Sequence, residues 1–188
     1  GLNNSNIRGQ DVEETESRTG FYLGMFLTRK YLGVKWLPEL VFQQRGMTKS
    51  VEGFFDVSNV LEKLQANYIT LGLNTSFNIS DIEFIAGSYI GYAITGESIA
   101  WDFPKNGNIY TRNVPIKEDE FFSRTEFGAK LEVLYYVTNI LQFGINYEMS
   151  FTPVYPTNEY GSNGFWEPEG NFYYSVLKFG FRYVLVEK

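Results

Sequence analysis

The sequence has 188 residues, a formal net charge of −6, and neither Cys nor His. This length suits a single domain, which we place at residues 1–188. The negative charge and the lack of a basic cluster exclude nucleic acid from the expected partners. Without Cys there is no disulfide or thiolate metal site, and without His the commonest general base and metal ligand is missing. We therefore expect no cofactor and no metal site, and hydrolase-type chemistry loses its usual base.

No stretch approaches the roughly 18–20 consecutive apolar residues of a transmembrane helix. A membrane β-barrel gives a different signal, which consists of segments of about ten alternating residues between turns. Residues 139–151 alternate without a break, so that one face of a strand is apolar and the other polar. The apolar face carries Leu141, Phe143, Ile145, Tyr147, Met149 and Phe151. The polar face carries Gln142, Gly144, Asn146, Glu148 and Ser150.

The same period of two recurs along the chain and predicts an all-β fold. Residues 1–18 are polar and acidic and are expected to form a loop, although residues 1–7 also suit the end of a strand. Pro38 predicts a local irregularity in its strand, because proline cannot donate a hydrogen bond to the ladder. Strands are expected at residues 19–29, 34–45, 67–77, 82–95, 121–137, 139–151 and 172–185.

Long and short connections alternate between these strands, and outer-membrane barrels alternate in the same way because their periplasmic turns are tight and their extracellular loops long. The pattern predicts a periplasmic C-terminus. Within the first long connection, residues 57–65 are expected to form a short helix capped by Ser58. The short connections are expected at residues 30–33, 78–81 and 138–139, and the long ones at 46–65, 96–120 and 153–171.

The strand number predicts one further strand near the N-terminus. Seven strands follow residue 18, and single-chain bacterial barrels have an even number. An eighth strand should therefore precede residue 3. Either residues 1–7 are its end, or the sequence given lacks most of it. The resulting prediction is an eight-stranded antiparallel up-and-down transmembrane β-barrel with a filled polar lumen.

The polar faces of the expected strands carry eleven charged residues that we assign to an ion network in the lumen. Five acidic and six basic groups can pair, and an interior of eight strands has room only for side chains, so no open pore is expected. Inward glycines, such as Gly128 and Gly144, suit a narrow lumen. The predicted network consists of Lys35, Glu39, Arg45, Glu83, Arg124, Glu126, Lys130, Glu132, Glu148, Lys178 and Arg182.

Aromatic residues on the apolar faces fall near strand ends, as in the aromatic girdles of membrane proteins. At the short-turn end they are Trp36, Phe77, Tyr135 and Tyr183, and at the long-loop end Phe21, Tyr92, Phe151 and Tyr173. One alternative stays open, a water-soluble lipocalin-like barrel with its apolar face inside, which would bind a hydrophobic ligand.

Five segments of the chain, in this order, resemble the PorT-like outer-membrane β-barrel family of Bacteroidota. They are G-L-N-N-S-N-I at 1–7, G-F-Y-L-G-M-F-L at 20–27, L-P-E-L-V-F-Q-Q-R-G at 37–46, I-A-G-S-Y-I-G-Y at 85–92 and L-K-F-G-F-R-Y at 177–183. The resemblance covers nearly the whole chain and accommodates Pro38, since the family often has Pro-Glu-Leu there. It implies an outer-membrane location and no common activity, with some members linked to protein secretion.

Residues 178–185 are similar to the C-terminal signal that the barrel-assembly machinery reads, which implies this machinery as a partner during biogenesis. The signal consists of a polar residue, a glycine and then alternating hydrophobic residues. Val186, Glu187 and Lys188 extend beyond it and depart from the usual pattern. The resemblance also implies outer-membrane lipid around the barrel.

For function, the sequence favours a non-enzymatic barrel that is structural or binds a protein or glycan partner through its long loops. Aromatic residues are common anchors in binding loops. The alternative is a lipid-modifying outer-membrane enzyme in which Glu126 and Glu132 act as an acid/base pair, but Arg124 and Lys130 beside them favour an ion network. We therefore expect no catalytic residues. The candidate loop anchors are Trp101, Tyr160, Phe165 and Trp166.

Overall fold

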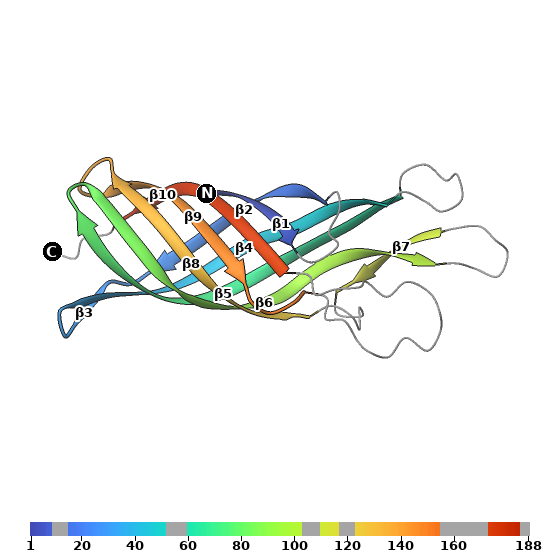
Figure 1. Cartoon of the computed structure of the whole chain (residues 1–188), viewed down its shortest axis with the longest axis horizontal. Coiled ribbons are helices and arrows are strands. Elements are labelled where there is room, and N and C mark those ends of the chain that lie inside the picture. The colour runs from blue at the N-terminus through green and yellow to red at the C-terminus, as the bar shows by residue number, and fades with distance from the viewer. Residues whose placement is uncertain (9–14, 52–59, 103–109, 117–122, 155–172, 185–188) are drawn as a thin grey trace.

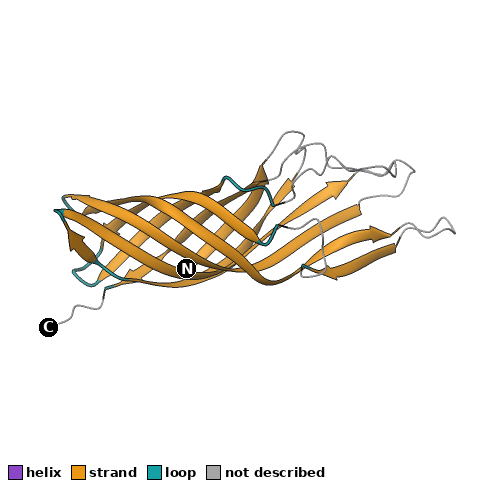
Figure 2. Ribbon diagram, turned by 90° about the horizontal axis from the view of Figure 1, so that it is seen from below, coloured by secondary structure: helices purple, strands orange, loops and turns teal. Residues whose placement is uncertain are grey.

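The computed structural model describes residues 1–8, 15–51, 60–102, 110–116, 123–154 and 173–184. In these ranges the chain is all-β (Figures 1 and 2). No helix within them is long and apolar enough to span a membrane. The strands are β1 (Leu2–Arg8), β2 (Thr15–Phe26), β3 (Arg29–Tyr31), β4 (Val34–Val51), β5 (Val60–Ile79), β6 (Ile82–Asp102), β7 (Tyr110–Pro115), β8 (Thr125–Tyr136), β9 (Leu141–Ser150) and β10 (Tyr173–Tyr183).

Eight of these strands close into an antiparallel ring in the order β1, β2, β4, β5, β6, β8, β9 and β10. The ring closes because β1 pairs with β10 on one side and with β2 on the other. Apart from β3 and β7, which pair with only one neighbour, spatial order follows chain order. The predicted all-β, eight-stranded, up-and-down arrangement is therefore confirmed as a closed ring, which we call the strand ring.

The N-terminal segment is the eighth strand of the ring, which confirms the alternative that placed this strand at residues 1–7. The prediction of a loop over residues 1–18 is wrong for residues 2–8 and 15–18. The polar side chains of this strand form hydrogen bonds to backbone groups of β4. The Asn3 side-chain nitrogen donates to the Gln44 carbonyl oxygen at 2.8 Å, and the Ser5 hydroxyl donates to the Gly46 carbonyl oxygen at 2.8 Å. Small polar side chains thus satisfy backbone groups inside the ring, where the sequence pattern suggested solvent.

Two further connections are shorter than predicted because strands continue into them. The predicted helix at 57–65 is wrong for residues 60–65, which lie in β5, and residues 57–59 fall outside the described ranges. Val60 pairs with Val51 of β4. An isolated helix of nine residues is marginal, whereas pairing along β4 gives each residue a backbone partner. In the predicted loop 96–120, β6 likewise continues to Asp102 and pairs with β7.

The two ends of the strand ring differ. The short turns lie at one end together with the C-terminal end of β10, and we call this the turn end (Figure 1). At the opposite end, which we call the loop end, the β4–β5 and β6–β7 strand pairs project beyond the ring (Figure 2). At the turn end, Leu32 and Gly33 both have positive φ, of 50° and 78°. A two-residue hairpin turn with two positive φ values matches the right-handed twist of its strands.

Pro38 interrupts the ladder on only one side of β4. On the β5 side the register is unbroken, with Pro38 opposite Leu73. On the other side β2 ends at Phe26 and β3 begins at Arg29, so the break lies opposite Pro38. The Leu27 amide donates to the Pro38 carbonyl oxygen at 3.0 Å, but proline has no N–H to return the bond. The predicted irregularity is therefore present, and it separates β3 from β2.

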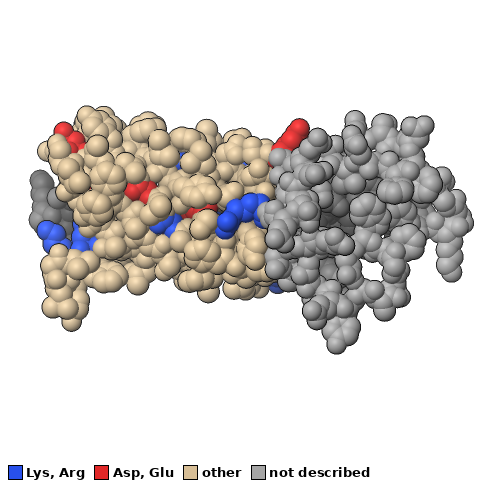
Figure 3. All heavy atoms as spheres, viewed as in Figure 1, with Lys and Arg blue, Asp and Glu red and all other residues tan. Residues whose placement is uncertain are grey.

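The side chains of the ring are arranged with apolar groups outside and charged groups inside. Outward residues along the strands include Leu71, Ile90, Leu131 and Phe181, all at least half exposed, whereas inward residues such as Lys178 are almost fully buried. The viewed face in Figure 3 is correspondingly poor in charged side chains over the described strands. This is the reverse of the arrangement that the lipocalin-like alternative requires.

Candidate functional site

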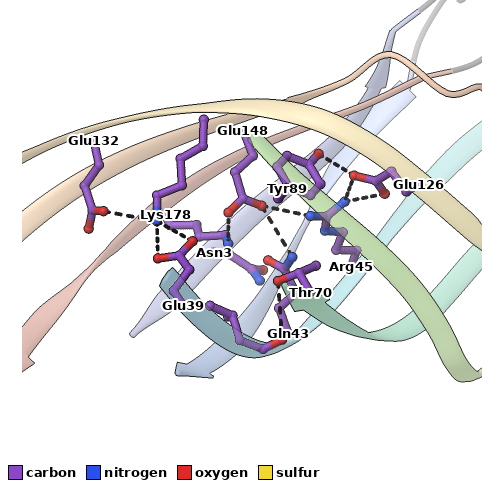
Figure 4. Close-up of polar contacts among 12 residues, drawn as sticks. Asn3, Glu39, Gln43, Arg45, Thr70, Tyr89, Glu126, Glu132, Glu148 and Lys178 are labelled. Atoms are coloured by element: carbon purple, nitrogen blue, oxygen red, sulfur yellow. Dashed lines mark hydrogen bonds and ion pairs between the residues drawn. The ribbon is translucent and has the colours of Figure 1, made fainter. Parts of the chain in front are cut away.

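The interior of the strand ring contains two clusters of buried charged side chains, and the first surrounds Arg45. Its guanidinium group forms ion pairs with Glu126 and with Glu148, where Nη2 and Oε2 are 2.8 Å apart (Figure 4). The Tyr89 hydroxyl donates to Glu126. The Arg45 Cζ atom also lies 5.0 Å from the ring centroid of Tyr68. These charge-assisted and cation–π contacts compensate the desolvation of an arginine that is only 1% exposed.

The second cluster lies nearer the turn end and is centred on Lys130. The Lys130 ammonium nitrogen is 2.5 Å from Glu39 Oε2 and 3.2 Å from Glu132 Oε2. Glu132 also accepts from Arg182 Nη2 at 2.8 Å. The cluster thus alternates basic and acidic groups, so that each of these charges faces one of opposite sign.

Glu148 extends the first cluster to Lys178. One carboxylate oxygen accepts from Arg45, and also from the Gln43 side-chain nitrogen at 3.3 Å. The other oxygen pairs with Lys178. Because Glu148, Arg45 and Lys178 are all at most 2% exposed, this carboxylate balances two cations that have little access to water. Removal of Glu148 therefore takes an ion-pair partner from two deeply buried cations.

A separate ion pair lies at the turn end, between Lys35 and Glu83. Glu83 also accepts hydrogen bonds from the Tyr136 hydroxyl at 2.7 Å and from the Gln142 side-chain nitrogen at 3.2 Å. Lys35 is partly exposed while Glu83 is buried. The carboxylate is therefore fully engaged and is not positioned as a free base.

Apolar side chains lie on either side of the central clusters. Leu37, Ile85 and Leu134 form a buried layer, with Phe26 packed against it. Leu37 stands between Lys35 and Glu39 on the inward face of β4, so this layer separates the turn-end pair from the central charges. Toward the loop end lies a larger buried cluster consisting of Ile7, Met47, Leu64, Ala66, Tyr68, Ala93, Ile116, Val154, Tyr174 and Val176.

Ten of the eleven residues assigned to the lumen form these ion pairs, and Arg124 is the exception. Its guanidinium group donates to the Ala93 carbonyl oxygen at 3.2 and 3.3 Å and lies 4.7 Å from the Tyr92 ring centroid. Arg124 precedes the first residue of β8, so the alternation that places Glu126 inward does not extend to it. Without it, the paired charges of the described interior are five carboxylates against five basic groups.

Charge alone did not identify the neutral members of the network. Tyr89, Gln43, Gln142 and Tyr136 each donate a hydrogen bond to a network carboxylate. The period of two places Tyr89 and Gln43 on inward faces, so the alternation carried the signal that would have found them. Gly128 provides the space that Tyr89 occupies, since a methyl group there would lie 2.6 Å from Tyr89 Cζ.

The candidate loop anchors cannot be assembled into one site. Trp101 lies in β6, opposite Thr111 of β7, and is not in a loop as predicted. Tyr160, Phe165 and Trp166 lie outside the described ranges. Within those ranges no group of three or more acidic side chains is arranged to hold a metal ion.

A scan of protein-family models found no match to this chain, and a search of curated proteins found none either.

Proposed function

We propose that the chain is a non-enzymatic outer-membrane β-barrel protein whose strand ring spans the bilayer. The observation that carries the proposal is the inverted burial of the ring, in which outward side chains are apolar and the interior holds five paired carboxylates. In water this arrangement would expose a continuous apolar surface. In a bilayer the same surface contacts lipid, and the paired charges fill the interior.

Seven of the eight ring strands are long enough for this proposal, whereas β1 has seven residues. A tilted transmembrane strand needs about 9–11 residues. β8, β9 and β10 have 12, 10 and 11 residues. Strands of this length cross the hydrocarbon region once, and their backbone groups are paired on both sides because the ring closes.

The alternation of turns and loops supports an orientation with the turn end in the periplasm and the loop end outside the cell. The resemblance to the PorT-like barrels of Bacteroidota, including the C-terminal signal for the barrel-assembly machinery, points to the same location. Some members of that family are linked to protein secretion, and we extend this role to the present chain as part of the proposal.

The interior favours a structural or binding role over catalysis or transport. Glu126 and Glu132, the candidate acid/base pair, are each occupied by basic partners and are buried. The apolar layer of Leu37, Ile85 and Leu134 crosses the interior, which opposes ion conduction. We propose that a protein or glycan partner binds at the loop end, where the β4–β5 and β6–β7 strand pairs extend the sheet beyond the ring (Figure 2).

The test is folding of the chain from urea into neutral detergent or phosphatidylcholine vesicles. We expect β-sheet circular dichroism and a gel band that migrates differently before and after boiling, together with near-zero conductance in a planar bilayer. A monomer that is compact and β-rich in buffer without detergent would refute membrane insertion. Large, stable conductance would refute the closed interior while leaving insertion intact.

A further inference from the structure

Six outward or rim side chains at the loop end form a continuous surface that the ion network does not use. Phe127 and Phe151 have ring centroids 6.1 Å apart, and their strands are joined there by a hydrogen bond from the Phe151 amide to the Phe127 carbonyl oxygen at 2.8 Å. Tyrosines and arginines lie on either side of them, on neighbouring strands. We call this surface the rim patch; it consists of Arg8, Tyr92, Arg124, Phe127, Phe151 and Tyr173.

Each arginine of the rim patch is held by the wall of the ring, through bonds that use only some of its donors among the described residues. Arg8 Nη2 donates to the Ser150 carbonyl oxygen at 2.8 Å, and its Cζ atom lies 5.7 Å from the Tyr173 ring centroid. Arg124 donates Nε and Nη2 to the Ala93 carbonyl oxygen and lies over Tyr92. A guanidinium group has five N–H donors, and the bonds to described residues use one donor of Arg8 and two of Arg124.

The charge of these two arginines is not balanced by a carboxylate in the described part of the chain. The ion pairs found there involve Arg45 and Arg182, but neither Arg8 nor Arg124. A carbonyl oxygen positions a guanidinium group without neutralising it. Within the described residues, both groups therefore keep an uncompensated positive charge and N–H donors that suit an external anion.

The aromatic part of the rim patch continues directly into the apolar outer face. Tyr92, Phe127 and Phe151 are 45–51% exposed, and Ile90, which pairs with Phe127, is 50% exposed. Aromatic rings with adjacent arginines are expected where acyl chains meet polar headgroups.

We propose that the rim patch binds a phosphate-bearing lipid of the outer leaflet, with the headgroup phosphates at Arg8 and Arg124 and acyl chains against the aromatic rings. The inference rests on the proposed membrane insertion and adds a lipid class to it. Guanidinium groups bind phosphate oxygens through paired, charge-assisted hydrogen bonds. Two arginines separated by aromatic rings suit a headgroup with two phosphates better than a small free anion.

The test is native mass spectrometry of the full chain, folded in neutral detergent and titrated with diphosphoryl lipid A. A basic side chain near an anionic membrane surface strengthens the binding of that surface. Each Arg→Gln change should therefore weaken lipid binding about fivefold, and both changes together about 25-fold. The matched control is Arg29→Gln. Arg29 is exposed on β3 at the turn end, so this variant should bind as the wild type does.

Other probes separate the possible outcomes. Lipid A without phosphates should bind the wild type as weakly as diphosphoryl lipid A binds the double variant. Unchanged binding by the double variant, equal weakening by Arg29→Gln, or full displacement of the lipid by millimolar inorganic phosphate would overturn the lipid site. The same samples are run unboiled and boiled on a gel. Heat-modifiable protein without lipid binding refutes only this inference, whereas protein that never becomes heat-modifiable refutes the proposed function and the inference together.

Discussion

Arg45 Nη2 and Glu148 Oε2 lie 2.8 Å apart, and the two residues come from opposite walls of the strand ring. β4 and β9 are four positions apart in a ring of eight strands, so this ion pair spans the interior. A buried pair is costly to desolvate and costlier to break, because the remaining partner keeps an uncompensated charge. The contact across the ring therefore couples the position of β4 to that of β9.

Replacement of Glu148 by Gln should destabilise the fold strongly. Lys178 loses its ion pair and Arg45 loses one of two, and breaking a buried pair costs about 3–5 kcal/mol in the free energy of unfolding. The measurement is urea unfolding in a fixed detergent, followed by tryptophan fluorescence. Glu97→Gln is the control, since Glu97 is exposed on β6 and should change stability by at most about 0.5 kcal/mol.

A double variant tests whether the loss comes from the unpaired cation. Adding Lys178→Met to Glu148→Gln removes the charge left without a partner, so the double change should cost less than the sum of the two single changes. Additive costs would contradict the assigned contact between the two side chains.

Gly128→Val should destabilise the fold by overpacking. The new side chain would enter the space of the Tyr89 ring, which positions the hydroxyl that donates to Glu126. Overpacking of this kind costs about 1–3 kcal/mol. Ala129→Val is the control, because the neighbouring residue faces outward and has room for the larger side chain. Equal unfolding midpoints for the two variants would contradict the packing of Tyr89 on Gly128.

Pro38→Val should join β2 and β3 into one strand. The new N–H faces the Leu27 carbonyl oxygen, while the Leu27 amide already donates to residue 38. Hydrogen exchange should show a slowly exchanging amide at position 38 and slower exchange at Leu27, whose amide donates to residue 38. A fast-exchanging amide at position 38 would show that the break has another cause. Leu40→Val, one outward position along β4, should leave these rates unchanged.

The alternation of apolar and polar residues predicted the ring and most of its interior. Lys130, Glu132 and Glu148 all lie on inward faces because a period of two fixes the face of every residue once one is known. The sequence also predicted the short turn at Ser80 and Asp81, since these residue types favour turns. The sequence also predicted that the inward acidic and basic side chains form ion pairs, because the interior of eight strands has room only for side chains.

The parts that the sequence did not predict depend on long-range contacts. The strand at residues 2–8 was predicted only as one of two alternatives, because its polar side chains resemble those of a loop; Asn3 and Ser5 donate to backbone carbonyl groups more than 40 residues away. Residues 60–65 carry a helix-like pattern, but the partner strand β4 provides hydrogen bonds that local propensity cannot reveal. The alternation does not predict the position of the Arg124 side chain, because Arg124 precedes the first residue of β8.

A charge on the middle of the outer face should be far more harmful than one at the turn end. Leu131 is 63% exposed and lies midway along β8, whereas Leu32 is 86% exposed in the β3–β4 turn. Leu131→Lys should cost about 2–4 kcal/mol in the free energy of unfolding from vesicles, and Leu32→Lys about 0–1. Equal, small costs would indicate that water covers both positions.

The most direct test of the account uses the absence of Cys in the sequence, which allows a single fluorophore to be attached at any position. A Leu71→Cys variant is labelled and folded into vesicles that contain brominated lipid. Quenching of its fluorophore reports whether the outer face of β5 contacts acyl chains. Leu32→Cys serves as the reference at the turn end. We predict strong quenching at position 71 and weak quenching at position 32. Weak quenching at position 71 in correctly folded protein would contradict the claim that the apolar outer face of the ring lies in lipid.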